Sequence, residues 1–181
     1  MNNEAFYRDN TEGCDPYLPP LQRFLTSNPT ISIVEEYGTT GPSQTVVNAC
    51  SAGSDALGLA AEWIRSGDCD MVISGGADEL YQVTCAGFKA LMIYDTTPCK
   101  PFDAHRRGLN LGEGAAIFVL MSEALATQMQ VTPRGYILGY GSAADAYHFT
   151  KPRPDGLGLK MALEQALTTA GIDQPHIDHN R

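Results

Sequence analysis

Cys50 is the residue best placed for chemistry in this chain. It follows the apolar stretch 45–49 and precedes a run, rich in alanine and leucine, that extends to Arg65. The pattern predicts a cysteine where a strand gives way to a helix. Unpaired N–H groups and the positive end of the helix dipole meet there and favour the nucleophilic thiolate. A small residue buried in a core fits the position as well, because free cysteine is often just that.

The four histidines, at 105, 148, 176 and 179, add no second catalytic group by spacing alone. A histidine can activate a thiolate across space from anywhere in the sequence, so nothing in the spacing selects one. His176 and His179 are three residues apart, but this spacing alone does not define a metal site, so we expect none. The serine-hydrolase motif Gly-x-Ser-x-Gly is absent, which disfavours that class.

The glycine-rich segment 108–114 precedes an apolar run. A phosphate-binding loop lies instead between a strand and a helix and usually carries a lysine. We therefore expect a tight turn in which a buried Glu113 is satisfied by backbone amides, since a buried carboxylate needs such partners.

Composition bounds the class of protein. The chain has 181 residues, 43% of them hydrophobic and 18% charged, which suits a globular protein with one sizeable core. A net charge of −9 argues against nucleic acid as a partner, although the local pair Arg106 and Arg107 leaves an acidic partner open. The five cysteines include no Cys-x-x-Cys pair, so we expect reduced thiols and a cytoplasmic location. No stretch has the length of a membrane span, and the polar start does not resemble a signal peptide.

The elements that would position Cys50 follow from periodicity and from turn residues. Pro29 favours the start of a helix that stops at Gly38, although the β-branched residues of 31–34 pull toward a strand. We expect a strand at 45–47, then a helix buried on all sides and ended by Gly67, then a buried strand at 70–76. Strand, helix and strand in this order predict a βαβ unit of a parallel sheet.

The remaining elements continue the layered α/β pattern. We expect a helix at 81–93, a buried strand at 115–121, a short helix capped by Ser122, a strand at 135–140, and a helix from about 157 that stops at Gly171.

Five motifs occur in order along 28–178, and together they are highly specific. The motifs are Val-Asn-Ala-Cys50-Ser-Ala-Gly, Ser-Gly-Asp-Cys-Asp-Met-Val-Ile-Ser-Gly-Gly76-Ala, Lys100-Pro-Phe-Asp103, Leu-Gly112-Glu-Gly-Ala and Asp145-Ala-Tyr-His148-Phe-Thr-Lys-Pro. The chain resembles the β-ketoacyl-(acyl carrier protein) synthases of the thiolase superfamily, and most closely the elongating condensing enzymes of fatty acid and polyketide synthesis. The resemblance implies a central part of a thiolase-like α/β/α fold. Residues 1–130 would be a partial N-terminal domain carrying the nucleophile, and residues 131–181 the beginning of the C-terminal domain.

The resemblance also implies a reaction and its residues. Cys50 aligns with the acyl-accepting nucleophile, and its own N–H with one oxyanion donor. Phe88 matches a residue that lines the acyl pocket, and His148 lies in a motif near the active site without matching either catalytic histidine. The implied reaction is a decarboxylating Claisen condensation of an acyl thioester with malonyl-acyl carrier protein. The implied partners are acyl carrier protein, with its phosphopantetheine-linked acyl chains, and a second chain in a homodimer or heterodimer. No metal or redox cofactor is implied.

The sequence also departs from the family. The family's two catalytic histidines lie in a His-Gly-Thr motif and a Gly-His-Asn-like motif, and neither occurs in the 181 residues. Its glycine-rich gate and opening strands are missing too, and Arg106-Arg107-Gly108-Leu109 replaces the usual Arg-Asp-Gly-Phe. We therefore expect the isolated chain to be incomplete for condensation. The alternative is a non-catalytic remnant of the fold or an interaction subunit of a condensing-enzyme complex, but the retained Cys50 favours an enzymatic ancestry.

Overall fold

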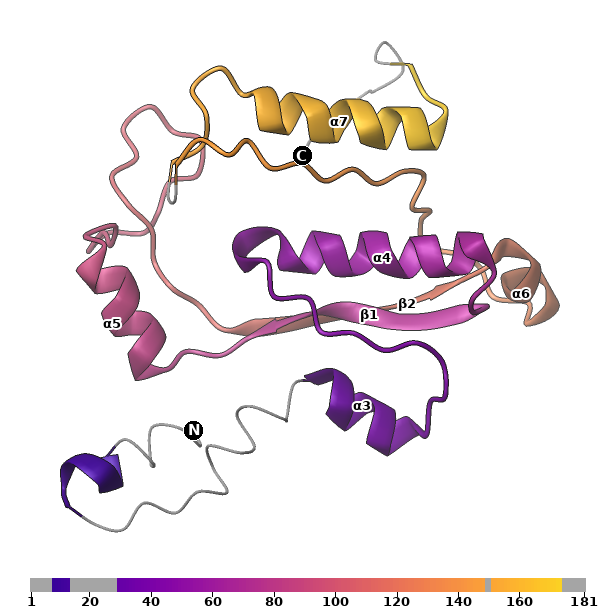
Figure 1. The fold of residues 1–181 in the computed structure, drawn as a ribbon, viewed down its shortest axis with the longest axis horizontal. Coiled ribbons are helices and arrows are strands. Elements are labelled where there is room, and N and C mark those ends of the chain that lie inside the picture. Colours follow the sequence, from indigo (N-terminus) through magenta and orange to yellow (C-terminus); the bar gives the residue numbers. More distant parts are fainter. Residues whose placement is uncertain (1–7, 14–28, 149–150, 174–181) are drawn as a thin grey trace. The chain divides into compact units, whose positions relative to one another are not determined.

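The computed structural model describes residues 8–13, 29–148 and 151–173 (Figure 1). The chain divides into two compact units. The first comprises Met1–Thr45 and Gly76–Ala116, and the second comprises Val46–Gly75 and Ile117–Arg181.

Two helices of the first unit lie where the sequence predicted them. Helix α3 spans Pro29–Tyr37, so the helical alternative is confirmed against the pull of its β-branched residues. Gly38 follows at a φ of +61°, a left-handed conformation that glycine adopts without strain and that suits the end of a helix. Helix α5 spans Gln82–Ala90.

The loop after α5 is fixed by one asparagine. Asn110 donates from Nδ2 to the carbonyl oxygens of Asp95 (2.9 Å) and Thr97 (3.2 Å), and its Oδ1 accepts from the amide of Cys99 at 2.6 Å. Its neighbour Gly108 lies so close to the backbone that an added Cβ would be 2.6 Å from the carbonyl oxygen of Ile93. Residues 108–113 form no turn: Leu109 pairs with Tyr94 in an isolated parallel bridge, so the predicted tight turn is wrong. Glu113 accepts from the amide of Leu80 at 3.4 Å, but it is exposed, so its predicted burial is wrong.

In the second unit, helix α4 (Ala52–Ser66) follows a single 3₁₀ turn, η1 (Ala49–Ser51), and ends at Gly67, whose φ is +80°. Asp55 in the first turn and Arg65 in the last turn complement the helix dipole. The prediction that this helix is buried on all sides is wrong. Its buried residues are Gly58, Ala60 and Ala61, whereas Gly53, Glu62 and Arg65 are exposed.

Strands β1 (Met71–Asp78) and β2 (Gly114–Met121) form a two-stranded sheet. The amide of Ser122 donates to the carbonyl of Asp70 at 2.9 Å, which places the end of β2 beside the start of β1 and makes the pair antiparallel rather than parallel. The hydroxyl of Ser122 also accepts from the amide of Leu125 at 3.2 Å and so caps α6 (Glu123–Gln128), as predicted.

Strand β2 was expected to be buried, and this prediction is wrong. Ile117, Phe118 and Val119 are 52%, 53% and 56% exposed. A strand is buried on both faces only where a layer covers each face, and the described residues do not supply both layers around β2.

The strands expected at 45–47 and 135–140 do not form, so the predicted βαβ unit is absent from the described residues. The reason is pairing. A strand requires a hydrogen-bonded neighbour, and neither segment has one among the named strands.

The segment around Tyr140 nevertheless keeps the alternation of an extended chain. A Cβ added to Gly139 or Gly141 would overlap the backbone of helix α7 (Leu157–Ala170), whereas the Tyr140 ring lies against Gly58 of α4. Successive residues therefore face opposite sides, as in a strand. The chain runs between the two helices in Figure 1. Helix α7 ends at Gly171, at a φ of +65°, as predicted.

Candidate functional site

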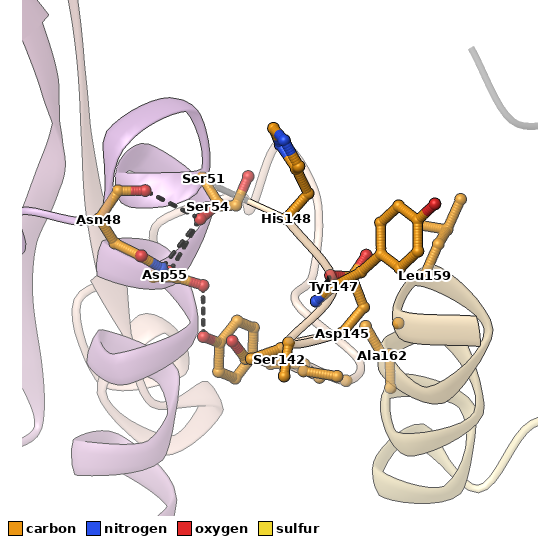
Figure 2. Close-up of a pocket in the computed structure, with 18 residues that line it drawn as sticks. Asn48, Ser51, Ser54, Asp55, Ser142, Asp145, Tyr147, His148, Leu159 and Ala162 are labelled. Carbon is orange, nitrogen blue, oxygen red and sulfur yellow. Dashed lines mark hydrogen bonds between the residues drawn. The ribbon is translucent and has the colours of Figure 1, made fainter. Parts of the chain in front are cut away.

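A cavity of about 1170 Å³ lies in the second unit (Figure 2). Its walls come from the start of α4 and the turn before it, from residues 139–148, and from one side of α7 between Gly158 and Ala166. The polar groups that line it include Asn48, Ser51, Asp55, Asp145 and His148. The segment with the predicted nucleophile thus borders a hollow that also carries the Asp-Ala-Tyr-His motif.

Cys50 is the middle residue of η1, directly before α4, and it is exposed. Its predicted position at the start of a helix is confirmed, although the segment before it is not a strand. Cys50 is not among the residues that line the cavity, whereas Asn48 and Ser51 on either side of it are. Ala49, immediately before it, has a φ of +48°, which is rare for a residue with a Cβ and costs about 1 kcal/mol or more.

A hydrogen-bond network surrounds the turn and centres on Asp55, which follows Cys50 by five residues. Its Oδ2 accepts from Nδ2 of Asn48 and, at 3.2 Å, from Oγ of Ser51. Its Oδ1 accepts from the hydroxyl of Tyr140 at 2.5 Å. Figure 2 shows the bonds converging on the Asp55 carboxylate.

The network has an electrostatic consequence. The Tyr140 hydroxyl, followed by Asn48, holds the pKa of Asp55 below its ordinary value. Burial, followed by the hydrogen bond to Asp55, raises the pKa of Tyr140. Both shifts describe an ionised carboxylate accepting from a protonated phenol, which is a strong charge-assisted bond.

The far wall of the cavity is organised by a second aspartate. Oδ2 of Asp145 accepts from the amide of Arg153 at 2.9 Å, and its Oδ1 accepts from the amide of Tyr147 at 3.3 Å. Gly158 in the first turn of α7 packs against Asp145, where an added Cβ would lie 2.9 Å from the aspartate Cβ. Asp145 therefore fixes the path of the backbone that carries His148, which is exposed and lines the cavity (Figure 2).

The structure does not decide the two pocket residues named from the family resemblance. Phe88 is half-buried in α5 of the first unit, whereas Cys50 and His148 belong to the second. Contact of Phe88 or His148 with an acyl chain stays a prediction.

Sequence reasoning missed Asp55 and Tyr140. One signal was available: Asp55 is the sole carboxylate between Cys50 and Glu62 in a run of small and apolar residues. Its partner Tyr140 is 85 residues away, and no local pattern connects them.

The described residues contain no cluster of three His, Cys, Asp or Glu side chains that could hold a metal ion. His176 and His179 lie outside the described residues. Within the described part of the chain, no helix has both the length and the apolar character needed to cross a membrane.

Comparisons with known proteins agree on one family. The family model "Beta-ketoacyl synthase, N-terminal domain" matches residues 21–126. A 3-oxoacyl-[acyl-carrier-protein] synthase 2 from Staphylococcus aureus is 32% identical over 170 residues, which is 91% of this chain. The chain spans 42% of the length of that relative.

Solved structures show the same likeness in three dimensions. One is a type II polyketide synthase acyl carrier protein in complex with its ketosynthase bound to the hexaketide. It is similar at a TM-score of 0.85 and 27% identity over 96% of this chain and 46% of that one. The ishigamide ketosynthase/chain length factor is similar at a TM-score of 0.78 and 35% identity over 82% of this chain and 37% of that one. The incomplete thiolase-like fold expected from the sequence is thereby confirmed.

Proposed function

Because the chain belongs to the β-ketoacyl synthase family, we propose that it carries the acyl-accepting centre of a decarboxylating condensing enzyme of fatty acid or polyketide synthesis. The observation that supports this proposal is Cys50, exposed on the turn that opens α4 and flanked by two residues that line the cavity.

The proposed reaction has two halves. In the first, Sγ of Cys50 attacks the carbonyl carbon of an acyl thioester, the carbon–sulfur bond to the carrier breaks, and the carrier thiol leaves with a proton. The product is an acyl-enzyme, which divides one difficult step into two. The backbone N–H of Cys50 would stabilise the oxyanion that forms in this step.

In the second half, a malonyl thioester loses its carboxylate as carbon dioxide. The electron pair left on carbon attacks the acyl group on Cys50. The bond from the acyl carbon to Sγ then breaks, and a 3-oxoacyl thioester leaves. The histidines that the family uses for this half are absent from the 181 residues, so this half requires groups that the chain does not contain.

The proposed partners are acyl carrier protein, which delivers the acyl chain, and a second condensing-type chain in a homodimer or heterodimer. The likeness to a ketosynthase in complex with its acyl carrier protein, and to a ketosynthase with its chain length factor, supports this choice. In the proposed enzyme, residues 1–130 belong to the N-terminal domain and residues 131–181 begin the C-terminal domain. Phe88 and His148 line the acyl pocket. Among the residues that the structure describes, Cys50, Cys69, Cys85 and Cys99 are free thiols, which supports a cytoplasmic location.

A second candidate function is a non-catalytic subunit of a condensing-enzyme complex. The likeness to solved ketosynthases that are paired with a chain length factor favours it. The two candidates differ in what happens at Cys50, because a non-catalytic subunit has no need to accept an acyl group there.

The deciding experiment incubates the chain with an acyl thioester of N-acetylcysteamine and maps acylated peptides by mass spectrometry. We expect acylation of Cys50 at least about tenfold faster than that of the other thiols. Cys69 is the internal reference, because burial, followed by the nearby Asp68 and Asp70, raises its pKa. Cys50→Ser should abolish the specific adduct. Labelling of all thiols at similar rates, or no labelling, contradicts the proposal and favours the non-catalytic subunit.

A further inference from the structure

We infer that Asp55 is a positioning residue, whose carboxylate holds the turn that presents Cys50 to its acyl donor. This inference rests on the proposed function, because it assigns Asp55 a part in the acylation of Cys50. Asp55 does not itself contact the reacting atoms in this account. It acts through the residues on either side of the nucleophile.

The bonds to Asp55 come from both sides of Cys50. Asn48 lies two residues before Cys50 and Ser51 directly after it, and both donate to the same oxygen of Asp55. They also bond to each other: Nδ2 of Asn48 donates to Oγ of Ser51 at 2.9 Å, and the single Ser51 hydroxyl proton is shared between Asp55 and the Asn48 carbonyl oxygen, which is 3.1 Å away. The backbone of Cys50 is therefore closed into a short loop tied at both ends to one side chain.

The loop that the network closes contains a residue with a strained backbone. This residue is Ala49, whose φ is +48°. An alanine leaves this conformation unless its surroundings over-determine it. The bonds of Asn48 and Ser51 to Asp55, together with the bonds between these two residues, hold the backbone on both sides of Ala49.

Tyr140 holds Asp55 in place from the other side. The Tyr140 hydroxyl holds the other carboxylate oxygen, and the Tyr140 ring packs on Gly58, one turn further along α4. The carbonyl of Tyr140 accepts from Oγ1 of Thr169 in α7 at 3.4 Å. Asp55 is thus hydrogen-bonded to a residue from a distant part of the sequence, and that residue contacts both α4 and α7. Through Tyr140, the packed helices restrict the movement of the turn.

The chemistry of the site requires a carboxylate. Three donors from Asn48, Ser51 and Tyr140 point at Asp55, and an ionised carboxylate only accepts. In Asp55→Asn the amide NH₂ would face the Tyr140 hydroxyl if the amide oxygen keeps the bonds from Asn48 and Ser51, so that hydroxyl would have to accept instead of donate, and the charge-assisted character of all three bonds would be lost. The change preserves shape and volume, so it separates the network from packing.

The experiment compares Asp55→Asn and Tyr140→Phe with the wild type, using the full chain and an acyl thioester of N-acetylcysteamine. We expect the rate of Cys50 acylation to fall about tenfold in Asp55→Asn and by a smaller factor in Tyr140→Phe. The matched controls, exposed Asp173→Asn and Tyr136→Phe, should stay within about twofold of the wild type. Reaction of the half-buried thiols Cys69 and Cys85 with iodoacetamide reports whether each variant remains folded.

Rescue separates positioning from a general loss of structure. Glycine adopts a positive φ as readily as a negative one. The double variant with Asp55→Asn and Ala49→Gly should therefore acylate at least about threefold faster than Asp55→Asn alone, because a glycine at position 49 needs less support from the network. A purely structural role for Asp55 predicts no recovery. Amide hydrogen exchange at residues 49–52 should also accelerate in Asp55→Asn while exchange in α7 stays unchanged.

The outcomes are distinct for the two claims. A wild-type chain that does not acylate at Cys50 overturns the proposed function. An active wild type whose acylation rate is unchanged in both Asp55→Asn and Tyr140→Phe overturns the positioning role alone. If Asp55→Asn does not fold, Tyr140→Phe decides: a slowed reaction supports the role and an unchanged rate overturns it.

Discussion

At the scale of single residues, the site depends on a carboxylate that remains ionised beside a strained turn. Asp55 is not deeply buried, and its state depends on donors rather than on neighbouring cations. The largest cause of its lowered pKa is the Tyr140 hydroxyl, and the next is the Asn48 amide. The presentation of Cys50 is therefore coupled to pH through a group that does not itself react.

This coupling predicts how stability changes in acid. A carboxyl group whose pKa is lower in the folded state stabilises the fold above its unfolded pKa, and this stabilisation is lost as pH falls through the folded pKa. For Asp55 the loss begins near its ordinary value of 3.8 and continues below it. Tyr140→Phe removes the main cause of the shift, so the deficit of the variant relative to wild type should shrink as pH falls.

The measurement is urea unfolding of both proteins at about pH 6 and at about pH 3. The difference in the free energy of unfolding should be larger at the higher pH. Tyr136→Phe, a change at a tyrosine that is 68% exposed, should show no such dependence. A deficit of Tyr140→Phe that is equal at both pH values contradicts the coupling.

At the scale of elements, local chemistry predicted helix ends better than strands. Pro29, Gly67, Ser122 and Gly171 all mark helix boundaries in the structure, because caps and left-handed glycines act within a few residues. The segments expected as strands at 45–47 and 135–140 have suitable residues but no assigned partner. Pairing is a non-local property, so composition alone could not decide it.

The same limit applies to the site. The position of Cys50 before a helix followed from the change in pattern after residue 49, which is local. The bond between Asp55 and Tyr140 joins residues 85 positions apart and depends on the packing of α4 on an extended chain. Family resemblance supplied the predicted role of Cys50 and named Phe88 and His148, but it did not reveal the network that supports the turn.

Helix α4 offers a matched pair of glycines for testing this packing. Gly58 lies against the Tyr140 ring, and an added Cβ would overlap the ring, whereas Gly53 has nothing within 4 Å. We expect Gly58→Ala to lower the free energy of unfolding by about 1–2 kcal/mol, since overpacking outweighs the gain in helix propensity. Gly53→Ala should raise it by about 0.5–1 kcal/mol, because only the propensity changes.

Thermal or urea unfolding of the two variants provides the test. The sign of the effect matters more than its size, because both changes add one methyl group to the same helix. Stabilisation by Gly58→Ala would mean that the ring moves away at little cost, and the anchoring of Asp55 through Tyr140 would then be weak.

At the scale of the whole molecule, the described residues form elements with little buried apolar volume. The buried hydrophobic residues among them are Ala60, Ala61 and Ala126. Larger apolar side chains on β2 and α7 are exposed, including Phe118 at 53% and Leu159 at 69%. Exposed apolar faces of this kind are typical of surfaces that contact another protein. The chain spans 42% of the length of its Staphylococcus aureus relative, so a fuller assembly is expected to cover them.

We expect the isolated chain to carry out the acyl-transfer half of the reaction and not the decarboxylation half. The 181 residues contain Cys50, the proposed nucleophile, but not the His-Gly-Thr and Gly-His-Asn-like motifs that the family uses for decarboxylation. We therefore expect the purified 181-residue chain to form the acyl-enzyme at Cys50 and to release no carbon dioxide from a malonyl thioester above the uncatalysed rate. The loss of one general acid–base group alone costs about a hundredfold or more in rate.

The measurement follows ¹⁴CO₂ from carboxyl-labelled malonyl thioester, with Cys50→Gln as the paired variant. Release of carbon dioxide by the isolated chain would show that residues within these 181 stabilise the enolate. His148, on the wall of the cavity, would then be the first residue to mutate.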